Sequence, residues 1–408
     1  MMYLKLALRN VFRNRRRTLI TLLAISFGCV ALIINGGIIY NIFWALRQDA
    51  IHGRHGHIQI YQRGYIENSM AKPLEYIISK EDYDLLKPLL VSLDHVEHVT
   101  SKLEFWGLAR ITKKGVPFMG IGVEPDQDST FSTQVTIIEG QGLSSRDPDG
   151  VILGKGLAEK IVAKPGDSIV MLGTDKRGYL HSVNAKVRGI FEGGMKVFDD
   201  WTMKVPIQKA QELLRLEGVQ SVVLLLDEDE ETEPLTRRLM TLFAERGLRL
   251  ELRAWPELAL FHNQVVDLFG RELNIIKLII SVIVILSILN TMGMTVVERT
   301  REIGTIMAVG TKRRNILLMF LLEALIIGLL GGVLGIVGGI VLAKIISLIG
   351  ITFPSPPGAT RPYIGKVDIV FSVLVLSFAI SVGSTLIAAF LPAYRASKLR
   401  IAEALRHV

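Results

Sequence analysis

The sequence predicts an α-helical membrane protein with four transmembrane helices and one large external α+β domain. Half of its 408 residues are hydrophobic and the mean hydropathy is +0.39, which is too apolar for an ordinary soluble chain. Charge is also divided along the chain. Residues 47–270 carry 27 Lys and Arg against 33 Asp and Glu, whereas the remainder has a net charge of +14. One part is therefore a solvated, mildly acidic domain, and the other consists of apolar spans with basic flanks.

The first apolar span covers residues 18–46 and contains no charged residue. As a helix it would be about 43 Å long at 1.5 Å per residue, well above the roughly 30 Å apolar core of a bilayer. We therefore expect it to continue beyond the lipid as a stalk. Three further spans are expected over residues 271–297, 316–349 and 368–394.

Lys and Arg gather before the first span, between the second and third spans, and after the fourth span. Because cytoplasmic flanks are enriched in these residues, both termini are expected in the cytoplasm. The segments expected inside are an amphipathic helix over residues 1–17, a coupling helix over residues 298–315 and a tail over residues 395–408. The external domain of residues 47–270 and a short loop over residues 350–367 are expected outside. A basic flank that only sets topology is the alternative for the first segment.

Residues 298–315 combine basic and apolar residues in a short element between two spans. This form is suited to pressing on a cytoplasmic partner. Glu302→Lys or Gly310→Trp is expected to uncouple that partner while leaving folding and membrane insertion intact. The residues expected to make the coupling contact are Glu298, Arg299, Arg301, Glu302, Ile303, Gly304, Met307, Gly310 and Thr311.

The third span has a glycine-rich face with overlapping pairs of small residues four positions apart. Such a face allows another helix to approach closely, so that dispersion forces stabilise the pair inside the membrane. Glu323 lies in the same span near its basic end. An ion or proton site is one interpretation of this carboxylate, and an ion pair with Arg313 or Arg314 is the other. The glycines of the packing face are Gly328, Gly331, Gly332, Gly335 and Gly339.

The external domain is expected to contain helices packed on a mixed sheet. Strand and helix patterns occur near both ends of residues 47–270, and these two outer parts are expected to fold together. Between them, residues 124–206 are richer in Gly, Asp and Pro and predict an inserted β-rich subdomain. The elements expected in the outer parts are strands over 57–62, 96–112, 116–123, 220–227 and 248–253, and helices over 80–93 and 233–246.

Motifs that carry chemistry are scarce. No P-loop of the form Gly-x-x-x-x-Gly-Lys-Ser/Thr occurs, so no ATPase activity is predicted for this sequence. His52, His55 and His57 alternate along an extended segment, which would spread metal ligands apart. Cys29 is the single cysteine, so neither an internal disulfide nor a cysteine-based metal cluster is expected. We therefore expect no catalytic residue, no metal site, no cofactor and no nucleic-acid partner.

The loop motif that begins at Glu298, the four-span plan with a large domain after the first span, and the glycine-rich third helix closely resemble the FtsX/MacB-like permease family of ABC transporters. The resemblance covers essentially the full length. Within the family, the sequence is most similar to the lipoprotein-releasing Lol-type (LolC/LolE) permease subunits. The strings that carry this similarity are Gly154-Lys-Gly-Leu-Ala158, Lys164-Pro-Gly-Asp167, Val187-Arg-Gly-Ile-Phe191 and Asp199-Asp200 ahead of Pro206.

The resemblance implies a permease subunit of a type VII transporter, which works by mechanotransmission in the bacterial inner (plasma) membrane with its large domain in the periplasm. It implies a second permease copy or a paralogue, and two copies of a cytosolic ABC ATPase that bind the ATP and Mg. Lipoproteins or other lipidated or amphiphilic substrates would be extracted or released, with a periplasmic carrier or adaptor as a further partner. Two alternatives stay open: MacB-like efflux of drugs, peptides or lipids through an adaptor and outer-membrane channel, and FtsX-like regulation of a cell-wall hydrolase.

The outer turns of the first span form an apolar stripe, because three isoleucines recur every four residues. A second helix that begins before Phe269 is expected to supply the opposite wall. We expect this surface to contact an amphiphilic substrate or membrane lipid, with helix packing at a dimer interface as the alternative. Its residues are Ile34, Ile38, Ile42, Phe43 and Phe269.

Overall fold

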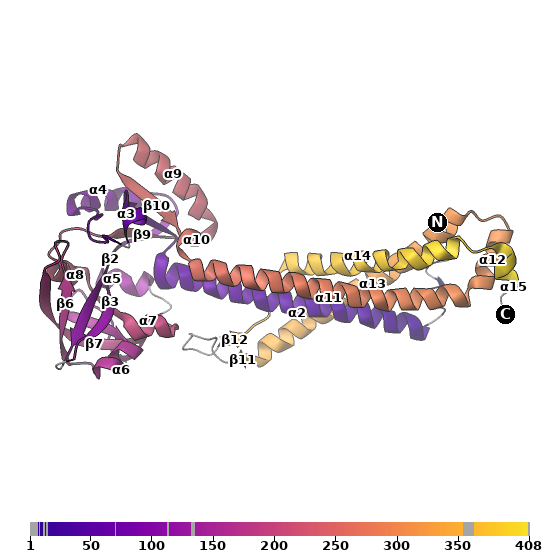
Figure 1. The fold of residues 1–408 in the computed structure, drawn as a ribbon, viewed down its shortest axis with the longest axis horizontal. Coiled ribbons are helices and arrows are strands. Elements are labelled where there is room, and N and C mark those ends of the chain that lie inside the picture. Colours follow the sequence, from indigo (N-terminus) through magenta and orange to yellow (C-terminus); the bar gives the residue numbers. More distant parts are fainter. Residues whose placement is uncertain are drawn as a thin grey trace. The chain divides into compact units, whose positions relative to one another are not determined.

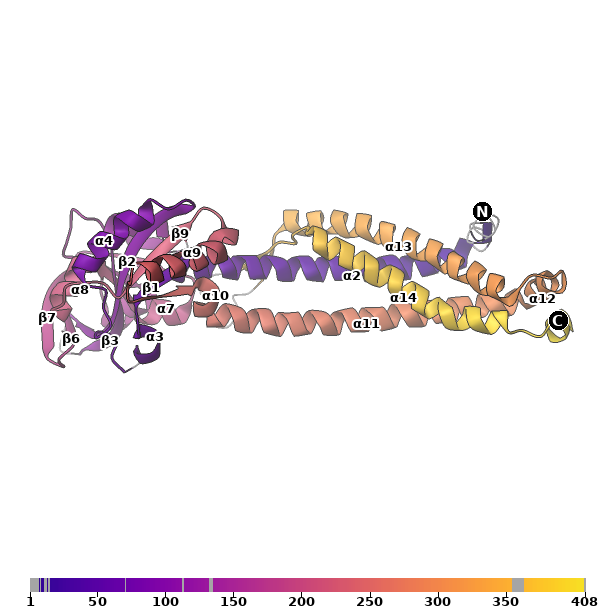
Figure 2. The ribbon, with the colours of Figure 1, turned by 90° about the horizontal axis from the view of Figure 1, so that it is seen from above.

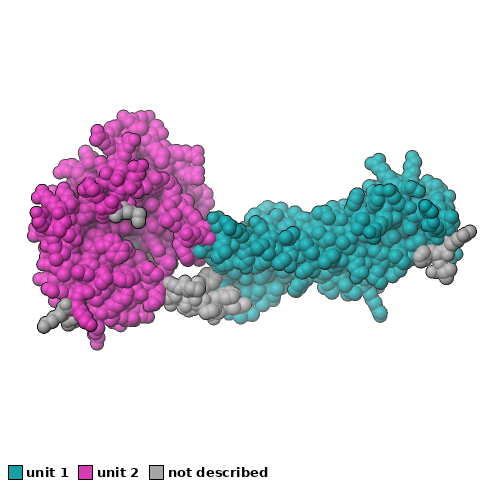
Figure 3. All heavy atoms as spheres, in the orientation of Figure 1, with its two compact units in different colours: residues 1–43, 265–352, 364–408 teal, residues 44–264, 353–363 magenta. Residues whose placement is uncertain are grey.

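The structure is a computed structural model that describes residues 7, 9–10, 13, 15–69, 71–111, 114–131, 135–353 and 363–406. The chain divides into two compact units, which are coloured separately in Figure 3. The helix predicted over residues 1–17 lies largely outside the described residues. Unit 1 contains residues 1–43, 265–352 and 364–408, and unit 2 contains residues 44–264 and 353–363.

Unit 1 is built on four long helices, each of which is long and apolar enough to cross a membrane. They lie side by side in both Figure 1 and Figure 2. Two short helices, α12 (Thr300–Ala308) and α15 (Ile401–Arg406), pack together at one end of this bundle. The four long helices are α2 (Arg15–Gln48), α11 (Leu260–Glu298), α13 (Arg313–Ile349) and α14 (Phe371–Ser397).

The first two long helices extend beyond the apolar spans predicted within them. Helix α11 begins at Leu260, before Phe269 as predicted, and its 39 residues make it about 58 Å long. After α2 the chain continues as a π-helical segment, η1 (Asp49–His55). A two-stranded sheet of β11 (Ile351–Phe353) and β12 (Tyr363–Gly365) lies between α13 and α14 in the sequence.

Helix α13 uses its glycines to approach two neighbouring helices. A Cβ atom added at Gly335 would lie 2.5 Å from the Cβ of Cys29 in α2, which is too close for a real side chain. A Cβ added at Gly332 would lie 2.6 Å from the ring of Phe378 in α14. The glycine face therefore packs against two helices, α2 and α14, and not against one. Of the other predicted glycines, Gly331 and Gly339 face α2 and Gly328 faces α14.

The strands β1 to β10 of unit 2 form one sheet in the order β10-β1-β9-β2-β3-β8-β5-β7-β4, and β6 pairs with both β2 and β7. Most neighbouring strands are antiparallel, whereas β3 with β8 and β5 with β7 are parallel. The strands are β1 (Ile58–Gln62), β2 (Val96–Arg110), β3 (Val116–Val123), β4 (Thr136–Gly140), β5 (Gly150–Gly154), β6 (Ser168–Thr174), β7 (Leu180–Glu192), β8 (Thr202–Pro206), β9 (Ser221–Leu226) and β10 (Leu250–Ala254).

The two ends of unit 2 share this sheet. Strand β1 lies between β9 and β10, where Ile60 is opposite both Val222 and Leu252. The strands of residues 124–206 continue the sheet, because β8 pairs with β3 and β6 pairs with β2. The inserted region is thus β-rich and contributes side chains to the same hydrophobic core as the outer parts.

Helices of unit 2 bury apolar side chains against this sheet. Helix α4 (Lys80–Val91) is capped by Ser79, whose hydroxyl accepts a hydrogen bond from the N–H of Asp82 at 3.1 Å. Helices α8 (Ile207–Leu214) and α9 (Thr232–Glu245) add leucines to the core. The remaining short elements are α3 (Tyr65–Asn68), α5 (Pro125–Phe131), α6 (Lys155–Ile161), α7 (Lys196–Trp201), α10 (Trp255–Leu258) and the 3-10 turn η2 (Asp229–Glu231).

Candidate functional site

Helix α12 is held against the end of the bundle by its apolar face. Ile303 and Met307, one turn apart, are buried in the hydrophobic cluster that also contains Phe320 of α13. Gly304 lets α15 approach, because a Cβ added there would lie 2.8 Å from the Cβ of Ala404. Helix α12 is therefore part of the packed core of unit 1 and does not project from it as a free helix.

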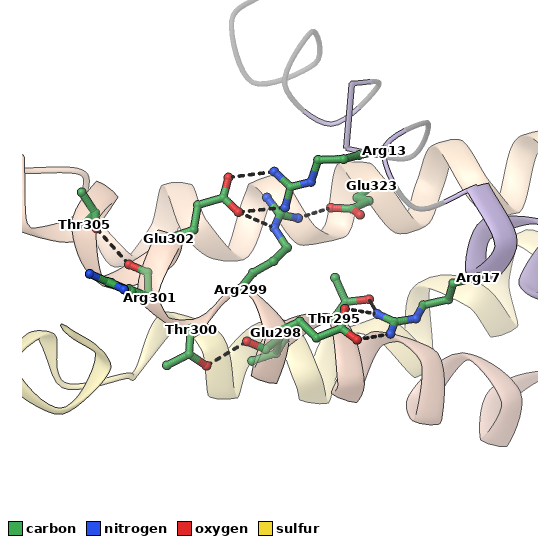
Figure 4. Close-up of polar contacts among 11 residues, drawn as sticks. Arg13, Arg17, Thr295, Glu298, Arg299, Thr300, Arg301, Glu302, Thr305 and Glu323 are labelled. Carbon is green, nitrogen blue, oxygen red and sulfur yellow. Dashed lines mark hydrogen bonds and ion pairs between the residues drawn. The ribbon is translucent and has the colours of Figure 1, made fainter. Parts of the chain in front are cut away.

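A buried ion pair lies at the start of α12 (Figure 4). Arg299 Nη1 is 3.1 Å from Glu323 Oε2, and the two side chains are 5% and 7% exposed. Arg299 Nε is also 3.1 Å from Glu302 Oε2, and the guanidinium lies 5.5 Å from the ring centre of Phe320. Arg299 thus joins the start of α12 to α13 by charge-assisted hydrogen bonds.

Glu302 is shared with a second arginine. The Nη1 and Nη2 atoms of Arg13 donate to the two carboxylate oxygens of Glu302 at 3.3 and 3.0 Å, the bidentate geometry that arginine favours. The hydrogen bonds from Arg13 hold the pKa of the Glu302 carboxyl below its usual range, against the opposing effect of partial burial. Charges therefore alternate in sign along a chain of four side chains, which are Arg13, Glu302, Arg299 and Glu323.

A second contact joins α2 to α11. Arg17 donates to Glu298 Oε2 at 2.8 Å and to Thr295 Oγ1 at 3.1 Å, and it also contacts the other oxygen of Glu298. Arg13 precedes Arg17 by four residues, and Glu298 precedes Glu302 by the same spacing, which is about one helical turn. The sequence prediction omitted both arginines from the site, although this matched spacing was a signal that could have identified them. We call six charged residues the ionic network: Arg13, Arg17, Glu298, Arg299, Glu302 and Glu323.

The nine predicted coupling residues do not share one surface. The exposed side is instead formed by Arg301 and Thr305 of α12 and by Val309, the residue that caps its C-terminal end. These three recur every four residues, and Val309 is 85% exposed. We call these three residues the outer face of α12; only Arg301 among them was predicted. Of the nine, Arg299, Ile303, Gly304 and Met307 are buried, Glu302 and Thr311 are half-buried, and Glu298, Arg301 and Gly310 are exposed.

The partner of Glu323 is Arg299, so the predicted pairing with Arg313 or Arg314 was wrong. The reason is geometric. Arg313 and Arg314 lie on the same helix as Glu323, nine or ten residues away, which places them about 13–15 Å from it along the axis.

The structure also changes the effect expected of Gly310→Trp and Glu302→Lys, the two variants proposed from the sequence. Gly310 has a φ of 102°, so Gly310→Trp would strain the turn between α12 and α13. Glu302→Lys would replace the carboxylate between Arg13 and Arg299 by a third cation. Neither variant separates partner docking from folding.

The predicted substrate surface is half-buried at each of its five residues, Ile34, Ile38, Ile42, Phe43 and Phe269. An apolar groove of about 130 Å³ opens between α2, α11 and α14 within unit 1. Phe43 lines this groove, and the other four predicted residues do not. The stripe of isoleucines and the groove are therefore different surfaces of α2.

Within the histidine cluster, His57 makes hydrogen bonds inside unit 2. His57 Nε2 lies 2.9 Å from Asp229 Oδ1, and His57 Nδ1 accepts a hydrogen bond from the N–H of Leu226 at 3.0 Å. Burial lowers the pKa of His57, and Asp229 opposes this effect. Across the described ranges, no group of three His, Cys, Asp or Glu side chains is placed to hold a metal ion.

Comparison with known proteins places both units in known families. Residues 18–242 match the MacB-like periplasmic core domain, and residues 274–401 match the FtsX-like permease C-terminal domain. The uncharacterized ABC transporter permease YvrN of Bacillus subtilis (strain 168) is 26% identical over 440 residues, which cover 99% of each chain. The lipoprotein-releasing system transmembrane protein LolC of Xylella fastidiosa (strain 9a5c) is 25% identical over 308 residues, or 71% of this chain and 73% of LolC.

Two further similarities are partial. The macrolide export ATP-binding/permease protein MacB of Brucella abortus (strain 2308) is 36% identical over 120 residues, which are 29% of this chain and 16% of that protein. The crystal structure of the periplasmic region of MacB from Actinobacillus actinomycetemcomitans covers 54% of this chain and 95% of its own, with 14% identity and a TM-score of 0.38.

The two family matches cover most of the long helices, the ionic network from Glu298 onward and the strands β1 to β9 of unit 2, and the match over residues 18–242 alone spans more than half of the chain. Four helices able to cross a membrane and a mixed α/β domain agree with this assignment. The chain therefore belongs to the MacB- and FtsX-like family of ABC transporter permeases.

Proposed function

We propose that this permease couples ATP hydrolysis by a separate ABC ATPase to a conformational change in unit 2, and that the change extracts or releases a lipidated or amphiphilic substrate. The ATPase binds at the outer face of α12. The observation that carries the proposal is the ionic network, because it ties the residues on both sides of the α11–α12 junction to other helices. Arg299 reaches Glu323 in α13, and Glu298 is held by Arg17 of α2.

The network makes α12 and the ends of the long helices move together. A buried ion pair resists separation, because the charge left behind would be desolvated without compensation. The apolar packing of Ile303 and Met307 acts in the same direction. A displacement of the outer face of α12 is therefore passed to α2, α11 and α13 and is not absorbed by a flexible hinge.

The proposal places the ionic network on the cytoplasmic side of a bacterial inner (plasma) membrane, with both termini, and unit 2 on the periplasmic side. Support comes from the Lys and Arg that flank the spans at this end, including Lys312, Arg313 and Arg314. The proposed assembly contains a second permease copy or a paralogue and two ATPase copies, which hold the ATP and Mg. A periplasmic carrier or adaptor would receive the substrate.

The size of the groove in unit 1 indicates that the membrane helices accommodate an acyl chain and not a drug molecule. Its volume of about 130 Å³ is below the roughly 300–1,000 Å³ of sites that enclose drug-sized molecules. Names of relatives point both ways, since LolC is named for lipoprotein release and MacB for macrolide export. The groove is thus too small for a drug-sized molecule, and LolC aligns with 71% of this chain whereas MacB aligns with 29%, so a lipidated substrate is proposed.

The docking part of the proposal is tested by charge reversal on the outer face of α12. Arg301→Glu combined with Val309→Glu should weaken retention of the ATPase at least about thirtyfold, as expected for the loss of two central contacts. The matched control is Arg400→Glu, an exposed charge reversal at the same end of unit 1 that lies outside α12. The measurement is quantitative co-purification of the ATPase with tagged permease, together with its ATP hydrolysis rate.

Normal retention of the ATPase by the double variant would contradict the assignment of the outer face of α12. Equal loss in the Arg400→Glu control would show that the effect is not specific to that face. The substrate class is tested on the same preparation by mass spectrometry of molecules that dissociate on ATP addition. Lipidated proteins are the expected result, whereas small amphiphilic drugs or a cell-wall hydrolase would favour the efflux or regulatory alternatives.

A further inference from the structure

The apolar groove of unit 1 carries a single charged side chain. Its walls come from three helices, α2, α11 and α14, and the charge is that of Lys277 in α11. Among the described residues, no carboxylate pairs with this ammonium and no side chain hydrogen-bonds to it. The lining residues include Ile39, Tyr40, Phe43, Lys277, Leu376 and Ile380.

The position of Lys277 along α11 corresponds to one thickness of the bilayer core. Glu298, held by Arg17, marks the basic end of the bundle. Lys277 lies 21 residues before Glu298 in the same helix, which is about 31 Å at 1.5 Å per residue. The apolar core of a bilayer is about 30 Å thick, so Lys277 lies at the level of the opposite headgroups.

An aromatic residue of α2 lies at the same headgroup level as Lys277. Tyr40 lines the groove and is 45% exposed, as expected of a tyrosine at a membrane interface. Apart from Gly36 and Ser377, apolar side chains line the rest of the groove, among them Ile39 and Ile380. The site thus combines a cation at headgroup depth with an apolar cleft.

The dimensions fit one hydrocarbon chain. An apolar cavity of about 150 Å³ holds a single benzene molecule, so a groove of about 130 Å³ has room for one short stretch of acyl chain. A lysine near a membrane surface attracts an anionic headgroup by roughly 1 kcal/mol, which is about fivefold in occupancy.

We propose that this groove is a binding site for an anionic phospholipid of the bilayer leaflet farthest from the ionic network. One acyl chain occupies the groove and the headgroup phosphate pairs with Lys277. The lipid stabilises the contact of α2 and α11 with α14 and stays in place during transport. The site differs from the α12 docking surface and does not require the ATPase.

The test uses the full chain alone, reconstituted in nanodiscs that contain either phosphatidylglycerol or phosphatidylcholine with a photoactivatable diazirine in one acyl tail. Adducts are mapped by peptide mass spectrometry. Phosphatidylglycerol should label peptides that contain Ile39 to Phe43 and Leu376 to Ile380 about fivefold more than phosphatidylcholine does. Lys277→Gln should remove this preference. Lys344→Gln is the matched control, since Lys344 is exposed in α13 and does not line the groove.

A steric variant tests the acyl-chain part independently. Leu376 lines the groove and is 46% exposed, so Leu376→Trp should fill the groove without disturbing a buried contact, and it should abolish labelling by both lipids. Equal labelling by the two lipids, an equal effect of Lys344→Gln, or unchanged labelling of Leu376→Trp would each overturn the proposal. Because no ATPase is present, these outcomes are independent of the proposed function.

Discussion

Glu323→Gln is expected to destabilise unit 1, because it removes the charge that compensates a buried arginine. The Glu323 side chain is 7% exposed, and its Oε2 accepts a hydrogen bond from Arg299 Nη1 at 3.1 Å. Glutamine keeps the size of the side chain and one acceptor oxygen. The substitution therefore tests the charge of the pair and not the packing around it.

The expected loss is about 3 kcal/mol. Removal of one partner from a buried ion pair costs about 3–5 kcal/mol, because the remaining charge is left in a low-dielectric environment. Arg299 keeps its second contact, with Glu302 at 3.1 Å, which favours the lower end of this range. Replacement of both members, as in Arg299→Met combined with Glu323→Leu, should recover most of the loss, because apolar residues of similar volume are often as stable as the buried pair.

The assay is denaturant titration of the purified chain in detergent, followed by helical circular dichroism. Glu323→Gln is measured beside one cycle made of Arg299→Met, Glu323→Leu and the double variant that combines them. Glu298→Gln is the matched control. It breaks the exposed contact with Arg17 and should have a much smaller effect, because solvent screens that pair. Equal destabilisation by Glu323→Gln and Glu298→Gln would refute the reasoning. A double variant that loses the full sum of the two single losses would also refute it.

Two further predictions concern the core of each unit. His57→Gln should make the stability of unit 2 less dependent on pH. Because the pKa of His57 is lowered in the folded state, its contribution to stability is complete above pH 6.5 and is lost as the pH falls. In thermal melts at several pH values, the melting temperature of the wild type should therefore fall more under acid than that of the variant. His95→Gln is the control, and its effect on the pH dependence of stability should have the opposite sign. Hydrogen bonding to Asp227 raises the pKa of His95, so the contribution of His95 to stability is lost as the pH rises. Gly335→Ala should lower the melting temperature because its Cβ would lie 2.5 Å from Cys29, whereas Gly383→Ala should leave it unchanged or raise it slightly because no atom lies within 4 Å. A melting temperature for Gly335→Ala equal to that of Gly383→Ala would show that close approach of the helices at this point is not required.

The elements of unit 2 were predictable because their signals are local. Alternating apolar residues identified β1 and β3 within one residue of their bounds, and helical spacing identified α4 and α9 within two. The long helices were found for the same reason, since an apolar run longer than the bilayer core has few other structures available to it. The start of α11 at Leu260 was predicted only as lying before Phe269, because the helix continues there through polar sequence outside the apolar run.

The pairing of charges was not predictable in the same way. Arg13 and Glu302 are 289 residues apart in the chain, and Arg299 and Glu323 lie on opposite sides of α12 in the sequence. The sequence shows that Glu323 needs a partner, because a carboxylate in an apolar span is costly. It does not show which of several nearby arginines the fold brings within reach.

By itself, the sequence determined the number of spans, the alternating and helical segments and the family resemblance, because each depends on composition or spacing within a short stretch. Tertiary structure alone decided which face of α12 is buried, how the glycines of α13 divide between α2 and α14, and where the groove with Lys277 opens. The physical reason is that these features depend on the packing of helices that are distant in the chain. The orientation of one helix about its axis against another is set by the close packing of all their side chains together.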